Sequence, residues 1–369
     1  MDNINIEKLR EYIKSDSDST YALYGFDAEL SSCLHELLDS MDIKYLDLNT
    51  DDLYDLSSSL EESKVDHILM LKNSYRICYD ATWLTSCVKS IICLDSDNIL
   101  CEEDKKNSLM NKRLWDVTAM NAKDDIEIGG WMSSYTREKF TMNEINDFIN
   151  NTKAKLLPYL KEENTVLEIG CASGFTMYSL SPYVRRYVGV DMSAVSVKKN
   201  LKKIEEENIK GVEVKCMAAD EISEFEDESF DVIILNSVIH CFKGYNYFYK
   251  VLKEIFKKVK KNGIVYIGDV MDLELKQQFE NSLVEYAKEN NYNTKVDISN
   301  EFLLSAKFFE CLKNELPIIQ DILISRKECE VKNELTMYRF DTLIKMNKCS
   351  DSFDGAFKMN AFSCNIFNK

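Results

Sequence analysis

The feature that most constrains the fold is a series of apolar runs of four to six residues that alternate with helix-like segments. Such alternation is typical of parallel strands joined by helices. Two later runs, Ile318–Ile324 and Met337–Ile344, are separated only by a charged connector, which favours an antiparallel pair. The sequence therefore predicts an α/β fold with a doubly wound, seven-stranded sheet. Its alternating strands are expected at Thr165–Ile169, Tyr187–Val190, Val212–Cys216, Phe230–Leu235 and Gly263–Ile267.

A smaller α/β unit is expected ahead of this sheet, because residues 20–94 show the same alternation on a shorter scale. The chain then turns polar and charged from Asp95 to Asn111, which is typical of a junction between domains. We therefore predict a small domain of docking or dimerisation role at residues 1–108, a main domain at 109–348 and a tail at 349–369.

Composition excludes several classes of function. The chain has 46 Lys and Arg against 63 Asp and Glu, a net charge of −17, which disfavours nucleic acid as a partner. No apolar window is long enough for a membrane span, and the first residues lack a leader pattern, so we expect a cytoplasmic protein. The 12 cysteines form no C-x-x-C pair, and we expect buried thiols and no metal site.

The first strand of the larger sheet runs into a glycine-rich turn that is expected to hold a ligand. Glu168 precedes Gly170, Cys171 and Gly174, and a helix-like segment follows. Glycines in such a turn let the backbone approach a ligand beyond the carboxyl ends of the strands. The turn predicts a small-ligand site at this edge of the sheet.

The next two strands also end in acids. Asp191 comes 17 residues after Gly174, and a carboxylate at that place can accept both hydroxyls of a ribose. Met192 follows it directly, and Asp220 closes the third strand, where it suits the exocyclic amine of adenine. Together these residues predict a nucleoside-binding crevice.

These residues resemble class I S-adenosylmethionine-dependent methyltransferases. The family signature, an acid followed by alternate glycines, is matched at Glu168, Gly170 and Gly174, with Ala172 in place of the middle glycine. The resemblance implies a Rossmann-like sheet and S-adenosylmethionine as cofactor. It assigns Asp191 to the ribose and Asp220 to the adenine side.

The resemblance extends to methyltransferase domains embedded in nonribosomal peptide synthetases, over about residues 115–346. It is carried by three runs, Gly130–Thr136, Leu235–Ile239 and Asn333–Asp341. Those domains mostly N-methylate an aminoacyl group on a carrier protein. The resemblance therefore implies a freestanding enzyme of natural-product metabolism that N-methylates an amino-acid or peptide-type substrate, free or carrier-bound.

Polar residues near the later strand ends are the candidates for the substrate side. They are Asn236, Asp269 and Glu334, with His240 as a candidate base or a structural histidine. Tyr135, with Trp131, is expected to cover the cofactor as part of a lid, with plain packing as the alternative. Two other readings stay open: an O- or C-methyltransferase with His240 as base, and a non-catalytic partner-binding module.

Overall fold

The structure is a computed structural model that describes residues 9–10, 13, 18–71, 75–85, 87–88, 90–93, 108–290 and 293–348. The chain divides into two compact units, with the described residues up to Cys93 in the first and residues 108–348 in the second. The predicted tail, 349–369, and most of the predicted junction lie outside the described residues. The domain boundaries and the role of the first unit stay predictions.

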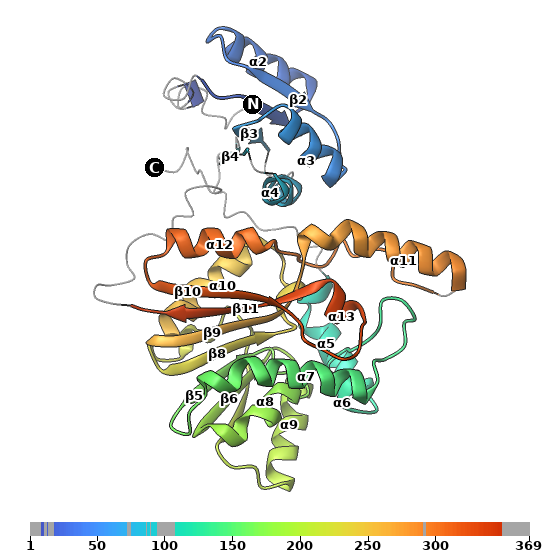
Figure 1. Ribbon diagram of the computed structural model, residues 1–369, viewed down its shortest axis with the longest axis vertical. Coiled ribbons are helices and arrows are strands. Elements are labelled where there is room, and N and C mark those ends of the chain that lie inside the picture. The colour runs from blue at the N-terminus through green and yellow to red at the C-terminus, as the bar shows by residue number, and fades with distance from the viewer. Residues whose placement is uncertain are drawn as a thin grey trace. The chain divides into compact units, whose positions relative to one another are not determined.

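The first unit is a four-stranded parallel sheet in the order β2-β1-β3-β4. Two of its helices begin where aspartates cap them, Asp27 for α2 and Asp52 for α3. Leu34 and Leu38 of α2 pack on Leu23 of the sheet. The elements are β1 (Tyr21–Tyr24), α2 (Ala28–Asp39), β2 (Tyr45–Leu48), α3 (Leu53–Glu62), β3 (His67–Met70), α4 (Tyr75–Leu84) and β4 (Ser90–Cys93) (Figure 1).

The second unit contains a seven-stranded sheet in the order β10-β11-β9-β8-β5-β6-β7, which confirms the predicted doubly wound sheet. The predicted late pair is antiparallel, since β11 runs against both of its neighbours, β9 and β10. The strands are β5 (Thr165–Ile169), β6 (Arg186–Asp191), β7 (Val212–Cys216), β8 (Phe230–Asn236), β9 (Val259–Met271), β10 (Ile319–Arg326) and β11 (Arg339–Met346).

Helices cover both faces of this sheet, with α7, α8 and α9 on one side and α10 and α12 on the other (Figure 1). α7 begins at a capping box made by Thr141 and Glu144, and its apolar residues fall on one buried face. The helices are α5 (Lys112–Asn121), α6 (Asp125–Ile128), α7 (Met142–Leu156), α8 (Phe175–Leu180), α9 (Ala194–Glu206), α10 (Tyr245–Lys258), α11 (Lys276–Asn290), α12 (Ala306–Glu315) and α13 (Glu334–Met337).

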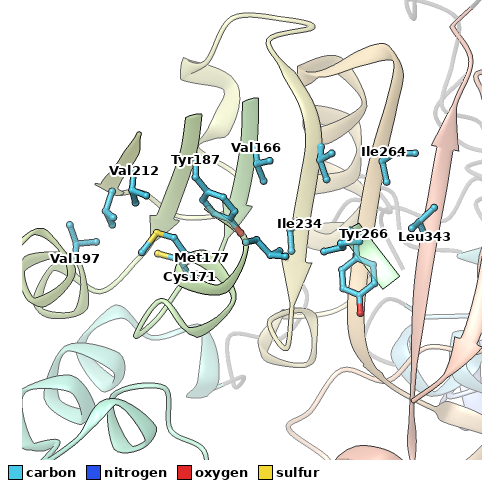
Figure 2. Close-up of a cluster of buried hydrophobic side chains, with 14 residues drawn as sticks. Val166, Cys171, Met177, Tyr187, Val197, Val212, Ile234, Ile264, Tyr266 and Leu343 are labelled. Atoms are coloured by element: carbon cyan, nitrogen blue, oxygen red, sulfur yellow. The ribbon is translucent and has the colours of Figure 1, made fainter. Parts of the chain in front are cut away.

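The core on one face takes a residue from nearly every strand, which Figure 2 shows as a row of side chains. Val166, Tyr187, Ile234 and Ile264 in this row are at most 9% exposed. Burial on this scale contributes about 1.5–3 kcal/mol for each large apolar side chain. The packed sheet therefore holds its strand ends in fixed positions. Within the described residues, no helix is both long and apolar enough to cross a membrane.

Candidate active site

The turn after β5 has the backbone that its glycines predict. Gly170 and Gly174 adopt φ values of 79° and 85°, in the left-handed region that glycine favours. A Cβ atom on Gly170 would lie 2.0 Å from Cγ2 of Val238, so the turn packs directly on the segment after β8. Only a glycine fits at position 170.

Three other residues at this edge adopt left-handed backbone without being glycine. Ala172 follows β5, Ser237 follows β8 and Asp269 lies near the end of β9, with φ values of 42°, 58° and 62°. Such backbone is strained in residues with a Cβ atom, and strain of this kind concentrates at ligand sites. Sequence analysis did not predict this strain, because alanine, serine and aspartate do not by themselves indicate a left-handed backbone.

An apolar cavity of about 100 Å³ lies beside the glycine turn. Asp191 provides its acidic edge. The Oδ2 atom of Asp191 accepts a hydrogen bond from the N–H of Ala172 at 2.9 Å, and Oδ1 accepts one from Ser193 at 2.8 Å. Each oxygen keeps a free lone pair, so the carboxylate can still accept two ligand hydroxyls. Apolar walls come from Ile169, Met192, Met217, Val238 and Phe242.

A polar cavity of about 450 Å³ adjoins the apolar one. The two share Gly170, Ala172, Ser237 and Cys241 in their walls, so they meet at the glycine turn. The polar cavity brings together the predicted residues Glu168, Cys171, Asn236, His240 and Glu334. Arg137, Lys295, Glu301 and Arg339 also line it, and sequence analysis did not single them out.

Glu168 forms part of the floor of the polar cavity. Its Oε2 atom accepts a hydrogen bond from the hydroxyl of Tyr187 at 2.9 Å. Burial raises the pKa of Glu168 to about 8, and the charge of Asp191 acts in the same direction. Burial also raises the pKa of the Cys171 thiol well above its ordinary value. No cluster of metal-binding side chains occurs among the described residues.

Several buried polar atoms in the polar cavity have no hydrogen-bond partner among the described residues. They are Asn236 Oδ1, His240 Nδ1 and Ser173 Oγ. The orientation of Asn236 follows from its neighbours: Thr152 uses its hydroxyl proton on the carbonyl of Phe148, so it can only accept from the Asn236 amide. The amide oxygen is therefore the Asn236 atom that is left without a partner. Unpaired buried polar atoms are costly unless a ligand satisfies them.

His240 is neutral in this setting. Burial, together with the positive charge of Arg339, lowers the pKa of His240 to about 4. The ring therefore carries no charge at neutral pH and one of its nitrogens is available as an acceptor. An ordinary histidine titrates near neutral pH, whereas the pKa of His240 lies well below that range.

Glu334 is held firmly at the cavity wall, with 3% of its surface exposed. The N–H of Ser134 donates to Oε2 at 2.8 Å, and the Ser134 hydroxyl donates to Oε1 at 2.9 Å. Burial raises the pKa of Glu334, while the positive charge of Arg339 opposes this shift. A carboxylate fixed in this way can hold an ammonium group or accept its proton.

Asp269 does not line either cavity, contrary to its prediction as a substrate-side residue. It is fully buried and pairs with Lys327 and Arg339, while the Ser237 hydroxyl donates to its Oδ2 at 2.7 Å. Asp341 pairs with the same lysine at 2.7 Å. Because Lys327 and Arg339 pair with it, the Asp269 carboxylate is not available to a substrate. Its contacts instead hold Ser237 and Arg339, which line the polar cavity.

Asp220 and Tyr135 also lie outside the lining of both cavities. The Asp220 carboxylate pairs with Lys250 at 2.6 Å and accepts the Tyr247 hydroxyl at 3.0 Å, so the turn lines the apolar cavity through Met217, Ala218 and Ala219. The Tyr135 hydroxyl bonds Ser282 at 2.7 Å, and its ring packs against α11. Trp131 does line the polar cavity.

Comparisons with known proteins agree with this geometry. Residues 160–341 match a family model described as a methyltransferase domain. Chondramide synthase cmdD of Chondromyces crocatus is 27% identical over 248 residues, 64% of this chain and 6% of the synthase. Nonribosomal peptide synthetase asqK of Emericella nidulans is 25% identical over 232 residues, 59% of this chain and 9% of the synthetase. The chain thus spans less than a tenth of either relative.

Among solved structures, phosphoethanolamine N-methyltransferase 1 of Haemonchus contortus, in complex with phosphoethanolamine and S-adenosylhomocysteine, aligns with a TM-score of 0.47 and 11% identity. The alignment covers 68% of this chain and 50% of that one. The matched domain, the strand order of its sheet and the glycine turn agree with one another. Residues 160–341 therefore form a methyltransferase domain, and the chain is related to methyltransferase segments of nonribosomal peptide synthetases.

Proposed function

We propose that this protein transfers a methyl group to the nitrogen of an amino-acid or peptide-type substrate, free or carrier-bound, in natural-product metabolism. The relatives are peptide synthetases, and this supports the substrate class. The observation that carries the choice of nitrogen is the polar cavity, where Asn236 Oδ1 and Nδ1 of neutral His240 lack partners and which the Glu334 carboxylate also lines.

The residues of the apolar cavity fit the nucleoside part of S-adenosylmethionine. Asp191 keeps two free lone pairs for the ribose hydroxyls, and Met192, Met217 and Phe242 offer apolar walls to the base. The cofactor, when bound, supplies an electrophilic methyl group on a sulfonium. The glycine turn connects both cavities, so it can present that group to the polar one.

The polar cavity fits an amine better than a carbon nucleophile, because its unpaired atoms include Asn236 Oδ1, an acceptor that needs an N–H or O–H donor. An ammonium group must lose a proton before its lone pair can attack. Glu334, whose pKa burial raises, and neutral His240 are the groups that can take this proton. The packed strand ends hold these groups in place, which fixes the direction of attack.

A second candidate is O-methylation with His240 as the base. The observation in its favour is the neutral ring with its buried Nδ1 atom, because a neutral ring can accept the proton of a hydroxyl without first losing its own. In that case Glu334 is not needed to hold a cation. The two candidates therefore differ in which of these residues the reaction needs more.

The test measures binding of S-adenosylhomocysteine by calorimetry and methyl transfer to amino acids and aminoacyl thioesters in Glu334→Gln and His240→Asn. We expect Glu334→Gln to lower kcat/KM by about 10- to 100-fold, the effect of losing a charged hydrogen bond. Cofactor affinity should stay within a factor of about two in both variants, since neither side chain lines the apolar cavity.

Different outcomes contradict different parts of the proposal. A wild-type protein that does not bind S-adenosylhomocysteine would remove the enzymatic function. Full activity in Glu334→Gln combined with loss of activity in His240→Asn would favour O-methylation. Activity toward hydroxyl acceptors alone would lead to the same conclusion.

A further inference from the structure

The cations of the polar cavity are not equally engaged. Lys295 pairs with Glu301, and Arg339 pairs with Asp269. Arg137 lines the same cavity, is exposed, and has no ionic partner among the described residues. It is thus the one guanidinium or ammonium in the described cavity wall whose charge no side chain there balances.

The acids of the polar cavity also differ in whether a cation balances their charge. Glu301 is paired, and burial raises the pKa of Glu168 to about 8, which leaves that carboxyl mostly uncharged at neutral pH. Glu334 receives only neutral donors, the N–H and hydroxyl of Ser134 with a longer contact at 3.5 Å from the Ser133 hydroxyl. No described cation lies within ion-pair distance of Glu334, and the charge of Arg339, which pairs with Asp269, acts on it only from farther away.

A single turn connects these two unbalanced groups. Ser134, which holds Glu334, lies three residues before Arg137. The turn is closed by hydrogen bonds from the N–H of Arg137 to the carbonyl of Ser133 at 3.0 Å and from the N–H of Ser133 to Glu138 at 2.8 Å. Arg137 also adopts a strained φ of 59°. The turn therefore fixes the backbone of Arg137 relative to the Glu334 carboxylate.

The neighbouring Lys139 shows that a cation in this segment can find protein partners. It bonds Asp124 and, at 3.0 Å, Glu127. Lys139 is exposed like Arg137 but does not line the cavity. The two residues are a natural pair for comparison, because they differ in whether their charge is already balanced.

We infer that the substrate of this site carries two opposite charges, with its amine at Glu334 and an anionic group at Arg137. The inference rests on the proposed N-methylation and makes Arg137 a specificity-determining residue. The anion is a carboxylate or a phosphate, the groups that a guanidinium recognises best. A free amino acid provides the first and the phosphopantetheine arm of a carrier protein provides the second.

The test titrates the full-length protein, with and without S-adenosylhomocysteine, by calorimetry. The probes are alanine, leucine and phenylalanine beside their carboxamides, and phosphopantetheine beside pantetheine. Wild type is compared with Arg137→Gln and with the control Lys139→Gln. We expect Arg137→Gln to weaken the anionic member of one probe pair by about tenfold or more, and to leave its uncharged counterpart unchanged.

The pattern identifies the source of the anion. A selective loss for the amino acids points to a free substrate, and a selective loss for phosphopantetheine points to a carrier arm. The inference is overturned if wild type and Arg137→Gln behave alike toward every probe, including no binding by either, or if Lys139→Gln shows the same loss. Failure to bind S-adenosylhomocysteine counts separately, against the proposed function.

Discussion

The two units of this protein alternate strands and helices in the same way, yet their strand ends differ. In the first unit, the described non-glycine residues with left-handed backbone are Asp42 and Lys64, which follow the ends of α2 and α3. In the large sheet, Ala172, Ser237 and Asp269 adopt this backbone at the carboxyl edge of the strands. Left-handed residues after a helix are ordinary terminators, whereas those at strand ends shape a cavity.

Polar groups at the two edges differ in the same way. At the end of β1 the Tyr24 hydroxyl donates to the carbonyl of Thr50 at 2.9 Å and contacts Asp51 at 3.3 Å. At the end of β8 and just beyond it, by contrast, Asn236 Oδ1 and His240 Nδ1 stay unpaired. The comparison teaches that alternation is enough to build a parallel sheet, but a ligand site also needs polar atoms that the fold leaves unsatisfied.

The largest expected effect is on cofactor affinity. Two aspartate variants, one in each unit, test whether an acid at a strand end contributes to this affinity only in the large sheet. Asp191→Ala removes both lone pairs proposed for the ribose and should weaken S-adenosylhomocysteine binding by about 100-fold or more, measured by calorimetry. The matched change, Asp51→Ala beyond β2, should leave this affinity unchanged. Equal affinities in wild type and Asp191→Ala would show that the two edges do not differ in this respect.

A smaller effect concerns the neutral state of His240. Its pKa of about 4 in the folded protein lies below the ordinary value of about 6.5, so the unfolded chain binds more protons in between. The stabilising effect of this difference is full above pH 6.5 and is lost as the pH falls toward 4. Between pH 7 and 5, the wild type should lose about 1–2 kcal/mol more unfolding free energy than His240→Gln.

Urea denaturation at the two pH values, followed by tryptophan fluorescence, measures this difference. The same histidine should give a pH–rate inflection near 4 to 5 if it acts as a base. An inflection near 6.5 that disappears in His240→Gln would mean that the ring is solvated, and would contradict the burial described above.

The smallest expected effect concerns the strain at Ala172. Replacing it by glycine relieves left-handed strain of about 1–2 kcal/mol and gives up about 0.4–1 kcal/mol through the freer unfolded chain. Ala172→Gly should therefore be about 0.5 kcal/mol more stable in urea denaturation, with cofactor affinity unchanged. A control in ordinary helical backbone, Ala119→Gly, should lose at least about 1 kcal/mol instead, because its buried methyl group is also removed. A loss of stability in Ala172→Gly would remove the argument from strain.

Much of the fold was predictable from the sequence, because apolar periodicity and glycine turns act locally. The expected ranges for β5 and β7 agree with the structure at both ends, and the antiparallel pair was recognised from its connector. The glycine turn and Asp191 also lie together as predicted. These features depend on residues near one another in the chain or on the general rule for strand ends.

The remaining site residues could not be predicted because their roles depend on distant partners. Asp269 and Asp220 look alike in sequence, as acids at strand ends, and both are consumed by basic side chains 30 to 70 residues away. Lys295 and Glu301 lie in a stretch without a motif. Arg339 and Ser134 fell within runs that resemble the family, and only the structure shows that they face the cavity or hold Glu334.

The order of the strands also affects how this protein is made on the ribosome. β11 lies between β9 and β10, so β10 has no described strand to pair with until residues 339–346 have been synthesised. Glu334 and Arg339 come from the same late segment. The nucleoside edge can therefore form while the chain is still growing, whereas the substrate edge is completed only after β11 has left the ribosome. Translation thus separates in time the two halves of the site.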